Sequence, residues 1–397
     1  PVSTLPTHRN PACPPALTMP FVALRMLTGD RAKYLGLIFA IAFSTFLLEN
    51  QTSIFAGILR RTGSQIADVT DAEVWVMDPA TKYFEETKAL KDTDLLRVRG
   101  VPGVLYAVRL FKGQPVARTP AGNFSAAVVL GLDDATLVGA PRRMVLGSWE
   151  RLREPDAVVV DRAGYHLLFP GEPLTLDRHL EMNDHLVRIV GISDASAPFA
   201  SFPIIHARYS EAVNFLGRER GQMAFVLARA VDGLSPEALA ERIQSATGLR
   251  ARTTHAFRWD CIRYYLANTG IPVNFGITIA IALIVGLVVS GQTFYLFTVE
   301  NLRQFGALKA MGVSNARLTG MILLQALTVG FIGYALGTGM AALFFEVFSR
   351  KIATRGIVLL GPNAVGVGIL MLLVVVTASL LSIRRVLVLE PAAVFRA

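Results

Sequence analysis

The residues that could carry out catalysis are scattered and form no recognised motif. The sequence has no G-x-x-x-x-G-K-[ST] phosphate cradle, no G-x-S-x-G nucleophile turn and no H-E-x-x-H zinc motif. His179 and His185 lie near Asp177 and Asp184, and imidazole with carboxylate could bind zinc. Their spacing fits no recognised zinc site and is typical of a polar surface turn. We therefore expect a non-catalytic chain that binds no metal or cofactor directly.

The composition indicates a membrane protein. Hydrophobic residues make up 52% of the 397 residues and charged residues only 17%, whereas about 25% is usual in globular proteins. The formal net charge of +9 arises in short segments beside apolar runs, because basic and acidic residues nearly balance between 60 and 273. This distribution favours cytoplasmic retention of basic residues over binding to nucleic acid.

Four apolar segments approach or exceed the roughly 20 residues that a membrane-spanning helix needs. They are predicted at 34–59, 274–299, 318–346 and 363–383. The first is interrupted by Glu49, roughly 22 Å along the helix from Tyr34 at about 1.5 Å per residue. We expect this carboxylate at the far interface, on a helix that continues out of the membrane as a stalk. The alternative is a substrate or proton contact inside the helix bundle.

The distribution of lysine and arginine predicts the orientation. Basic residues cluster before the first span (Arg25, Arg31, Lys33), between the second and third spans (Arg303, Lys309, Arg317), and after the fourth (Arg384, Arg385, Arg396). Both termini and the connection 300–317 are therefore expected in the cytoplasm, and the segment 60–273 outside it. The external loop 347–362 does not follow the rule, because it carries Arg350, Lys351 and Arg355. Cys13 and Cys261 would lie on opposite sides and could not form a disulfide within one chain.

The ends of the chain are expected to stay on the cytoplasmic side. Residues 1–20 are rich in proline and predict a disordered tail, and 21–33 mix apolar and basic residues as an interfacial amphipathic helix does. Residues 384–397 form the cytoplasmic tail. No small-residue cleavage site follows the first apolar run, so we expect no cleavable signal peptide.

The segment 60–273 predicts an α+β domain, with 115–220 as a β-rich insertion between two strand–helix–strand units. In the second unit, Ser235, Pro236 and Gly248 mark a helix by its cap, first turn and end. The predicted strands are 72–78, 103–111, 126–133, 156–161, 223–230 and 249–257, and the predicted helices are 93–99 and 235–248.

The third span contains Gly333 and Gly337 in a G-x-x-x-G pattern, with Gly330 nearby. Small residues let helix backbones approach closely in lipid. We expect these glycines to pack against another helix, which the sequence does not identify.

The connection between the second and third spans predicts a short amphipathic helix. Phe305, Leu308 and Met311 recur at helical spacing, and Gly312 follows as a helix-ending glycine. Such a helix could lie on lipid or dock into a groove on a partner protein.

The run QFGALKAMGVSNARL resembles the R-E-I-G-x-x-K-A-[ILM]-G-[AV]-S signature of MacB/FtsX-type (type VII) ABC transporter permeases. Phe305, Gly306, Lys309, Ala310, Met311 and Gly312 match or nearly match it, while Gln304 replaces the usual glutamate. The C-terminal Arg384, Arg385, Pro391 and Arg396 also resemble the family's ending. The stretches AEVWVMDP, GLDDATLVGAP and DAVVVDRAGY look most like the DevC-like subgroup.

The resemblance implies an architecture and a set of partners. Four transmembrane helices would carry a large α+β periplasmic domain between the first and second. The chain would lie in the bacterial inner membrane as a homodimer on two cytoplasmic ABC ATPase subunits, which alone would bind ATP and magnesium. Membrane lipids, a periplasmic adaptor (membrane fusion protein) and an outer-membrane channel would be further partners.

The resemblance also implies a mechanism, called mechanotransmission, in which ATPase motions reach the periplasmic domain and drive export of a lipid, glycolipid or other amphiphile. The coupling helix would comprise Glu300, Arg303, Phe305, Gly306, Lys309, Ala310, Met311 and Gly312. A charge at Phe305 or Gly306 would then uncouple the ATPase from a permease that remains folded. The alternatives are an FtsX-like signalling subunit that regulates periplasmic hydrolases and a Lol-like extractor of lipoproteins.

Overall fold

The computed structural model describes residues 23–27, 31–216, 223–349, 351 and 354–387. The tail predicted at 1–20, Cys13 and the C-terminal residues beyond 387 lie outside this part of the chain. Two compact units are present, and each is described by itself. The α+β unit comprises Ile54–Asn274 and Phe345–Val358, and the helical unit comprises the described residues of Pro1–Ser53, Phe275–Phe344 and Leu359–Ala397.

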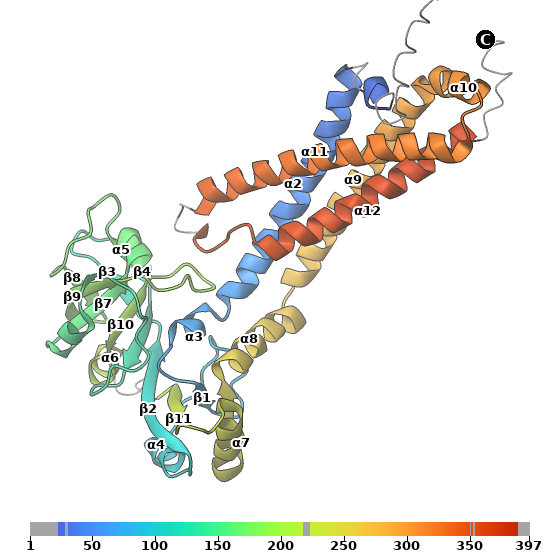
Figure 1. Ribbon diagram of the computed structural model, residues 1–397. Helices are drawn as coiled ribbons and strands as arrows, with labels where there is room; N and C mark the ends of the chain where they lie inside the picture. Colours follow the sequence, from blue (N-terminus) through green and yellow to red (C-terminus); the bar gives the residue numbers. More distant parts are fainter. Residues whose placement is uncertain (1–22, 28–30, 217–222, 350, 352–353, 388–397) are drawn as a thin grey trace, which may run out of the picture. The chain divides into compact units, whose positions relative to one another are not determined.

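Four helices of the described chain are long and apolar enough to cross a membrane (Figure 1). They are α2 (Arg31–Arg61), α9 (Ile271–Glu300), α11 (Asn315–Ser349) and α12 (Gly361–Leu387). Each contains one of the four predicted apolar segments. Helix α2 passes through Glu49 without a break, because the polar residues there lower hydropathy but are compatible with helical backbone.

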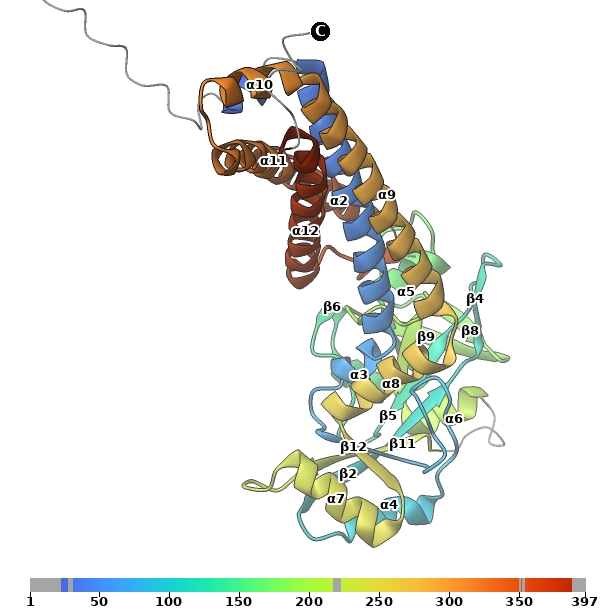
Figure 2. The same cartoon turned by 90° about the vertical axis from the view of Figure 1, so that its right-hand side faces the viewer.

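The helical unit has an apolar core between its helices. Helices α2 and α9 run side by side (Figure 2), with Ser44 against Gly286. Residues 23–27 form a helical turn in which Ala23 and Leu27 are buried and Leu24 and Arg25 are exposed. A short helix, α10 (Leu302–Ala310), connects α9 to α11.

The α+β unit is built on one twelve-stranded sheet within the described residues. Its strand order is β12-β1-β11-β2-β5-β10-β7-β9-β8-β3-β4, with β6 paired to β9. The strands are β1 (Val74–Met77), β2 (Val104–Gly113), β3 (Val116–Arg118), β4 (Phe124–Ala126), β5 (Val128–Leu132), β6 (Met144–Gly147), β7 (Ala157–Asp161), β8 (His179–Met182), β9 (His185–Ser193), β10 (Ile204–Arg208), β11 (Phe225–Ala230) and β12 (Arg250–Thr253). The long strand β2 pairs with β11 and with β5, so it joins the sheet of the two outer units to the inserted strands.

Helices cover both faces of this sheet. They are α3 (Ser64–Asp68), α4 (Asp92–Arg99), α5 (Arg162–Leu168), α6 (Tyr209–Leu216), α7 (Pro236–Thr247) and α8 (Thr254–Asn268), with a 3-10 turn, η1 (Trp149–Arg153). Strand β1 is buried on both sides: Val74 and Val76 belong to the core under α4 and α7, and Trp75 and Met77 to the core under α3 and α8. Helices α4 and α7 lie side by side in both views (Figures 1 and 2).

Local signals predicted the second strand–helix–strand unit well except at its end. The Ser235 hydroxyl accepts a hydrogen bond from the Ala238 amide at 3.2 Å, and Gly248 adopts φ +72° after the helix, as expected. The predicted strand 249–257 is wrong beyond Thr253. The Thr253 side chain accepts a hydrogen bond from the Ala256 amide at 3.2 Å and so caps α8, a helix that the β-forming residues concealed.

Candidate functional site

The connection between α9 and α11 starts at Asn301, which separates two helices by its own hydrogen bonds. Its side-chain amide donates to the Phe297 carbonyl at 2.8 Å and closes α9. Its carbonyl accepts from the amides of Gln304 and Phe305 at 3.0 and 3.1 Å and starts α10. Glu300 is therefore the last residue of α9. This differs from the prediction, which made Glu300 the first residue of the coupling helix.

Helix α10 ends in a Schellman motif at Gly312. The Val313 amide donates to the Leu308 carbonyl at 3.1 Å, and the Gly312 amide donates to the Lys309 carbonyl at 3.0 Å. Gly312 has φ +88° and no atom within 4 Å of its would-be Cβ. Glycine is required there by the left-handed backbone rather than by space.

The buried face of α10 differs from the predicted one. Phe305 is only 1% exposed and packs with Ala23, Leu318, Met321, Ile322 and Ile383. Leu302 and Leu308 pack partly against the same cluster, whereas Met311 is 72% exposed. Met311 is the C-cap of α10, with its amide bonded to the Ala307 carbonyl, and its side chain lies outside the cluster that holds Phe305 and Leu308. The apolar stripe is thus 302, 305 and 308.

This burial changes the expected effect of a charge at Phe305. An aspartate there would enter a packed apolar cluster and would disturb folding of the helical unit. The exposed residues of the connection are those that a partner could contact. We call Arg303, Gln304, Ala310, Met311 and Gly312 the α10 surface.

The glycines of the third span have definite neighbours. A Cβ on Gly333 would lie 2.7 Å from the Ile41 side chain, and one on Gly337 would lie 2.5 Å from the Ala42 carbonyl, both on α2. Gly330 faces Val375 of α12 at 3.2 Å. The G-x-x-x-G pair therefore packs closely against α2. The sequence alone did not identify this partner helix.

Glu49 is fully buried among the helices of the helical unit, a packing that the sequence did not indicate. Its side chain accepts a hydrogen bond from the Thr338 hydroxyl of α11 at 2.8 Å, next to Gly337. Thr45 and Ser53, one turn to either side on α2, are also buried. Glu49 thus belongs to a polar row inside the bundle.

One arginine of the basic loop that did not follow the charge rule forms an ion pair within the α+β unit. Arg355 donates to the buried carboxylate of Asp161 at 2.9 Å. The other oxygen of Asp161 accepts from the amides of Gly164 and Ile204 at 3.1 and 2.8 Å. Sequence reasoning missed this pair, although the unexplained Arg355 was the available signal.

Comparison with known proteins defines the class. The sequence model of the MacB-like periplasmic core domain matches residues 34–246, and that of the FtsX-like permease C-terminal region matches residues 276–391. With four apolar helices and an α+β domain between the first and second, the chain is a multi-pass membrane protein with a periplasmic domain. It belongs to the MacB/FtsX family of ABC transporter permeases.

Relatives extend over almost the whole chain. An uncharacterized ABC transporter permease of Mycobacterium bovis is 26% identical over 390 residues, covering 95% of this chain and 99% of the relative. Another from Mycobacterium tuberculosis is 24% identical over 393 residues, with the same shares covered.

Two solved structures are similar to part of the chain. The periplasmic region of MacB from Actinobacillus actinomycetemcomitans is 14% identical with a TM-score of 0.37, covering 51% of this chain and 96% of that one. The extracellular domain of the noncanonic ABC-type transporter YknZ from Gram-positive bacteria is 11% identical with a TM-score of 0.34, covering 46% and 98%.

Proposed function

We propose that the chain is the non-catalytic permease subunit of an exporter in the bacterial inner membrane, and that a separate ATPase drives it through the α10 surface. The observation that supports this most is the way in which α10 is held. Phe305 anchors the helix in the bundle, and the C-cap residue Met311 is exposed at its end. A firmly held helix with an exposed apolar tip is suited to docking in a groove on a partner.

The proposed assembly contains two ATPase subunits, which would bind ATP and magnesium, and a second copy of the permease. The span in α9 is the least buried of the four candidate spans. Only 17% of its most apolar stretch is buried by other parts of the chain. Its remaining surface is available to membrane lipid or to the second copy. A periplasmic adaptor and an outer-membrane channel are proposed on the DevC-like resemblance alone.

The proposed mechanism is mechanotransmission. Helix α2 runs without interruption from the helical unit into the α+β unit, and α9 starts in the α+β unit and continues through the helical unit. Unbroken helices resist bending, so a movement imposed at the α10 surface would reach the α+β unit through them. The cargo proposed is a lipid, glycolipid or other amphiphile.

The test is the substitution Met311→Asp in the full chain, reconstituted with the proposed partner ATPase. We expect the permease to fold normally and to lose most of its stimulation of ATP hydrolysis. Leu96→Asp, which places the same charge at a 64% exposed leucine on α4, should retain stimulation. Full stimulation by the Met311 variant would contradict docking through the α10 surface.

The proposed orientation has a separate test. In a chain with Cys13 and Cys261 replaced by serine, Met311→Cys should react with a membrane-impermeant maleimide in inverted vesicles and not in intact spheroplasts. Met311 is 72% exposed and is proposed to face the cytoplasm. The reverse pattern would place this connection outside the cytoplasm and would exclude coupling to a cytoplasmic ATPase.

A further inference from the structure

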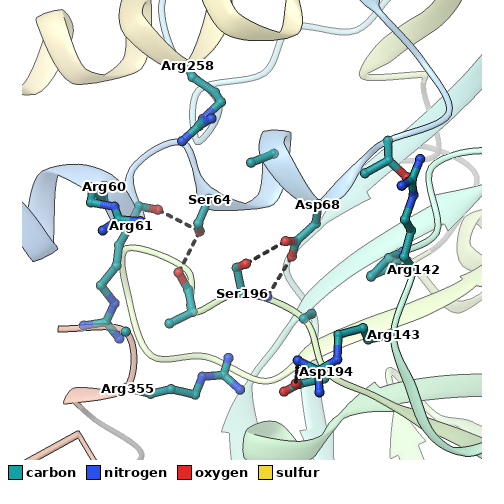
Figure 3. A pocket seen from close by; sticks show the side chains of 16 residues that line it. Arg60, Arg61, Ser64, Asp68, Arg142, Arg143, Asp194, Ser196, Arg258 and Arg355 are labelled. Atoms are coloured by element: carbon teal, nitrogen blue, oxygen red, sulfur yellow. Dashed lines mark hydrogen bonds and ion pairs between the residues drawn. The ribbon is translucent and has the colours of Figure 1, made fainter. Parts of the chain in front are cut away.

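The α+β unit contains an open pocket of about 540 Å³, a volume in the range of small-ligand sites (Figure 3). Five parts of the chain meet there: the end of α2 with α3, the segment before β6, the segment after β9, helix α8, and the loop at 355–356. None of the predicted site residues lies in it. It is a second candidate site, apart from the α10 surface.

Arginine dominates the lining of this pocket. Six arginines line it, against two aspartates: Arg60, Arg61, Arg142, Arg143, Arg258 and Arg355, with Asp68 and Asp194. Figure 3 shows their side chains around one space. Clustering like charges is unfavourable unless counter-charges or a bound anion offset it.

The carboxylates offset this charge only in part. Asp68 accepts hydrogen bonds from the Ser196 amide and hydroxyl at 2.7 and 2.6 Å. Asp194 forms ion pairs with Arg143 at 3.5 Å and with Arg162, outside the pocket, at 3.1 Å. Arg355 is neutralised by Asp161.

Three arginines of the lining have no carboxylate partner among the described residues: Arg60, Arg142 and Arg258. Within the described part of the chain, Arg142 donates only to the neutral Thr70 hydroxyl, at 2.8 Å. The Nε of Arg258 is buried with no hydrogen-bond partner in the described part of the chain. A buried guanidinium donor without an acceptor is costly, and a ligand oxygen would satisfy it.

We propose that this pocket binds a phosphate group, either on the headgroup of an anionic lipid or as free phosphate. Guanidinium groups bind phosphate oxygens through paired, charge-assisted hydrogen bonds. The chain also connects the pocket to the spans, because Arg60 and Arg61 end α2 and Arg355 precedes α12 by six residues. Arginines so near the ends of membrane-spanning helices are suited to lipid headgroups. The inference goes beyond the proposed function and holds whether or not an ATPase drives the chain.

The test uses the full chain in dodecyl maltoside, a detergent without phosphate. Calorimetric titration with inorganic phosphate and with short-chain dihexanoyl phosphatidylglycerol should detect binding of one or both. Arg258→Gln and Arg142→Gln should each weaken it by about tenfold. The matched control is Arg263→Gln, which removes one charge from an exposed position of the same helix, α8.

The two ligands distinguish the sources of the phosphate. Loss of lipid binding alone in the pocket variants identifies a headgroup site, and loss of inorganic phosphate binding alone identifies a site for the free ion. Weakening of both shows that the phosphate group itself is recognised. The proposal is overturned if the unmodified chain binds neither ligand, or if Arg263→Gln weakens binding as much as the pocket variants do.

Discussion

Arg355 and Asp161 form an ion pair of 2.9 Å across 194 positions of sequence, with the Asp161 side chain only 1% exposed. The carboxylate also caps α5 and holds the Ile204 amide of β10. One arginine in the loop before the fourth span thus neutralises a charge in the core of the α+β unit. This requirement explains why a basic residue is present in a loop predicted to be external.

Removal of one member of this pair should be strongly destabilising. Arg355→Ala leaves Asp161 buried without its counter-charge, at an expected cost of about 3–5 kcal/mol in the free energy of unfolding. Lys351→Ala, an exposed residue of the same loop, should change it by less than about 0.5 kcal/mol. Thermal unfolding of the purified full chain measures both, and equal stability of the two variants would show that the pair is dispensable.

Phe305 and Met311 should separate folding from coupling. Phe305→Ala removes a buried ring from the cluster under α10, so we expect a loss of about 3–5 kcal/mol in stability. Met311→Ala removes an exposed side chain and should cost less than about 0.5 kcal/mol. Unfolding in detergent tests this contrast, and a stable Phe305→Ala protein would contradict the anchoring role of the ring.

The close approach of α11 to α2 predicts different effects for two glycines of one helix. Gly333→Ala places a methyl group 2.7 Å from the Ile41 side chain and should destabilise the helical unit by about 1–3 kcal/mol. Gly339→Ala meets nothing within 4 Å and should stabilise α11 by about 0.5–1 kcal/mol. Opposite shifts in the unfolding temperature are expected, and shifts of the same sign would argue against the packing.

Buried His206 should make the α+β unit sensitive to acid. It packs edge-to-face on Trp149 with ring centroids 5.4 Å apart, and burial lowers the pKa of His206 to about 3. Between that value and its ordinary pKa of 6.5, the unfolded chain binds one more proton than the folded chain. Stability should therefore fall by about 1.4 kcal/mol for each pH unit lost in this window.

Comparison with His206→Phe isolates this contribution from the other titrating groups. At pH 8 the two proteins differ only by packing, and at pH 5 the variant should have gained roughly 2 kcal/mol relative to the unmodified chain. Chemical unfolding at both pH values gives the difference. A constant difference between pH 8 and pH 5 would show that His206 does not titrate on unfolding.

Much of the architecture could be predicted because its signals are local. An uncharged run of some 20 residues requires a lipid or protein environment wherever it lies in the chain. The cap at Ser235 and the stop glycines at Gly248 and Gly312 act on the few residues beside them. Spans, several strands and helix ends could therefore be derived from neighbouring residues alone.

The remaining features depend on residues that are far apart in sequence. Periodicity grouped Met311 with Phe305, yet the residues that form the cluster under α10 come from distant parts of the chain and cover only Phe305. The same holds for Glu49 with Thr338 and for Arg355 with Asp161. A partner hundreds of positions away leaves no trace in local hydropathy or charge, so these contacts, and the arginine pocket, could emerge only when the folded chain brought the segments together.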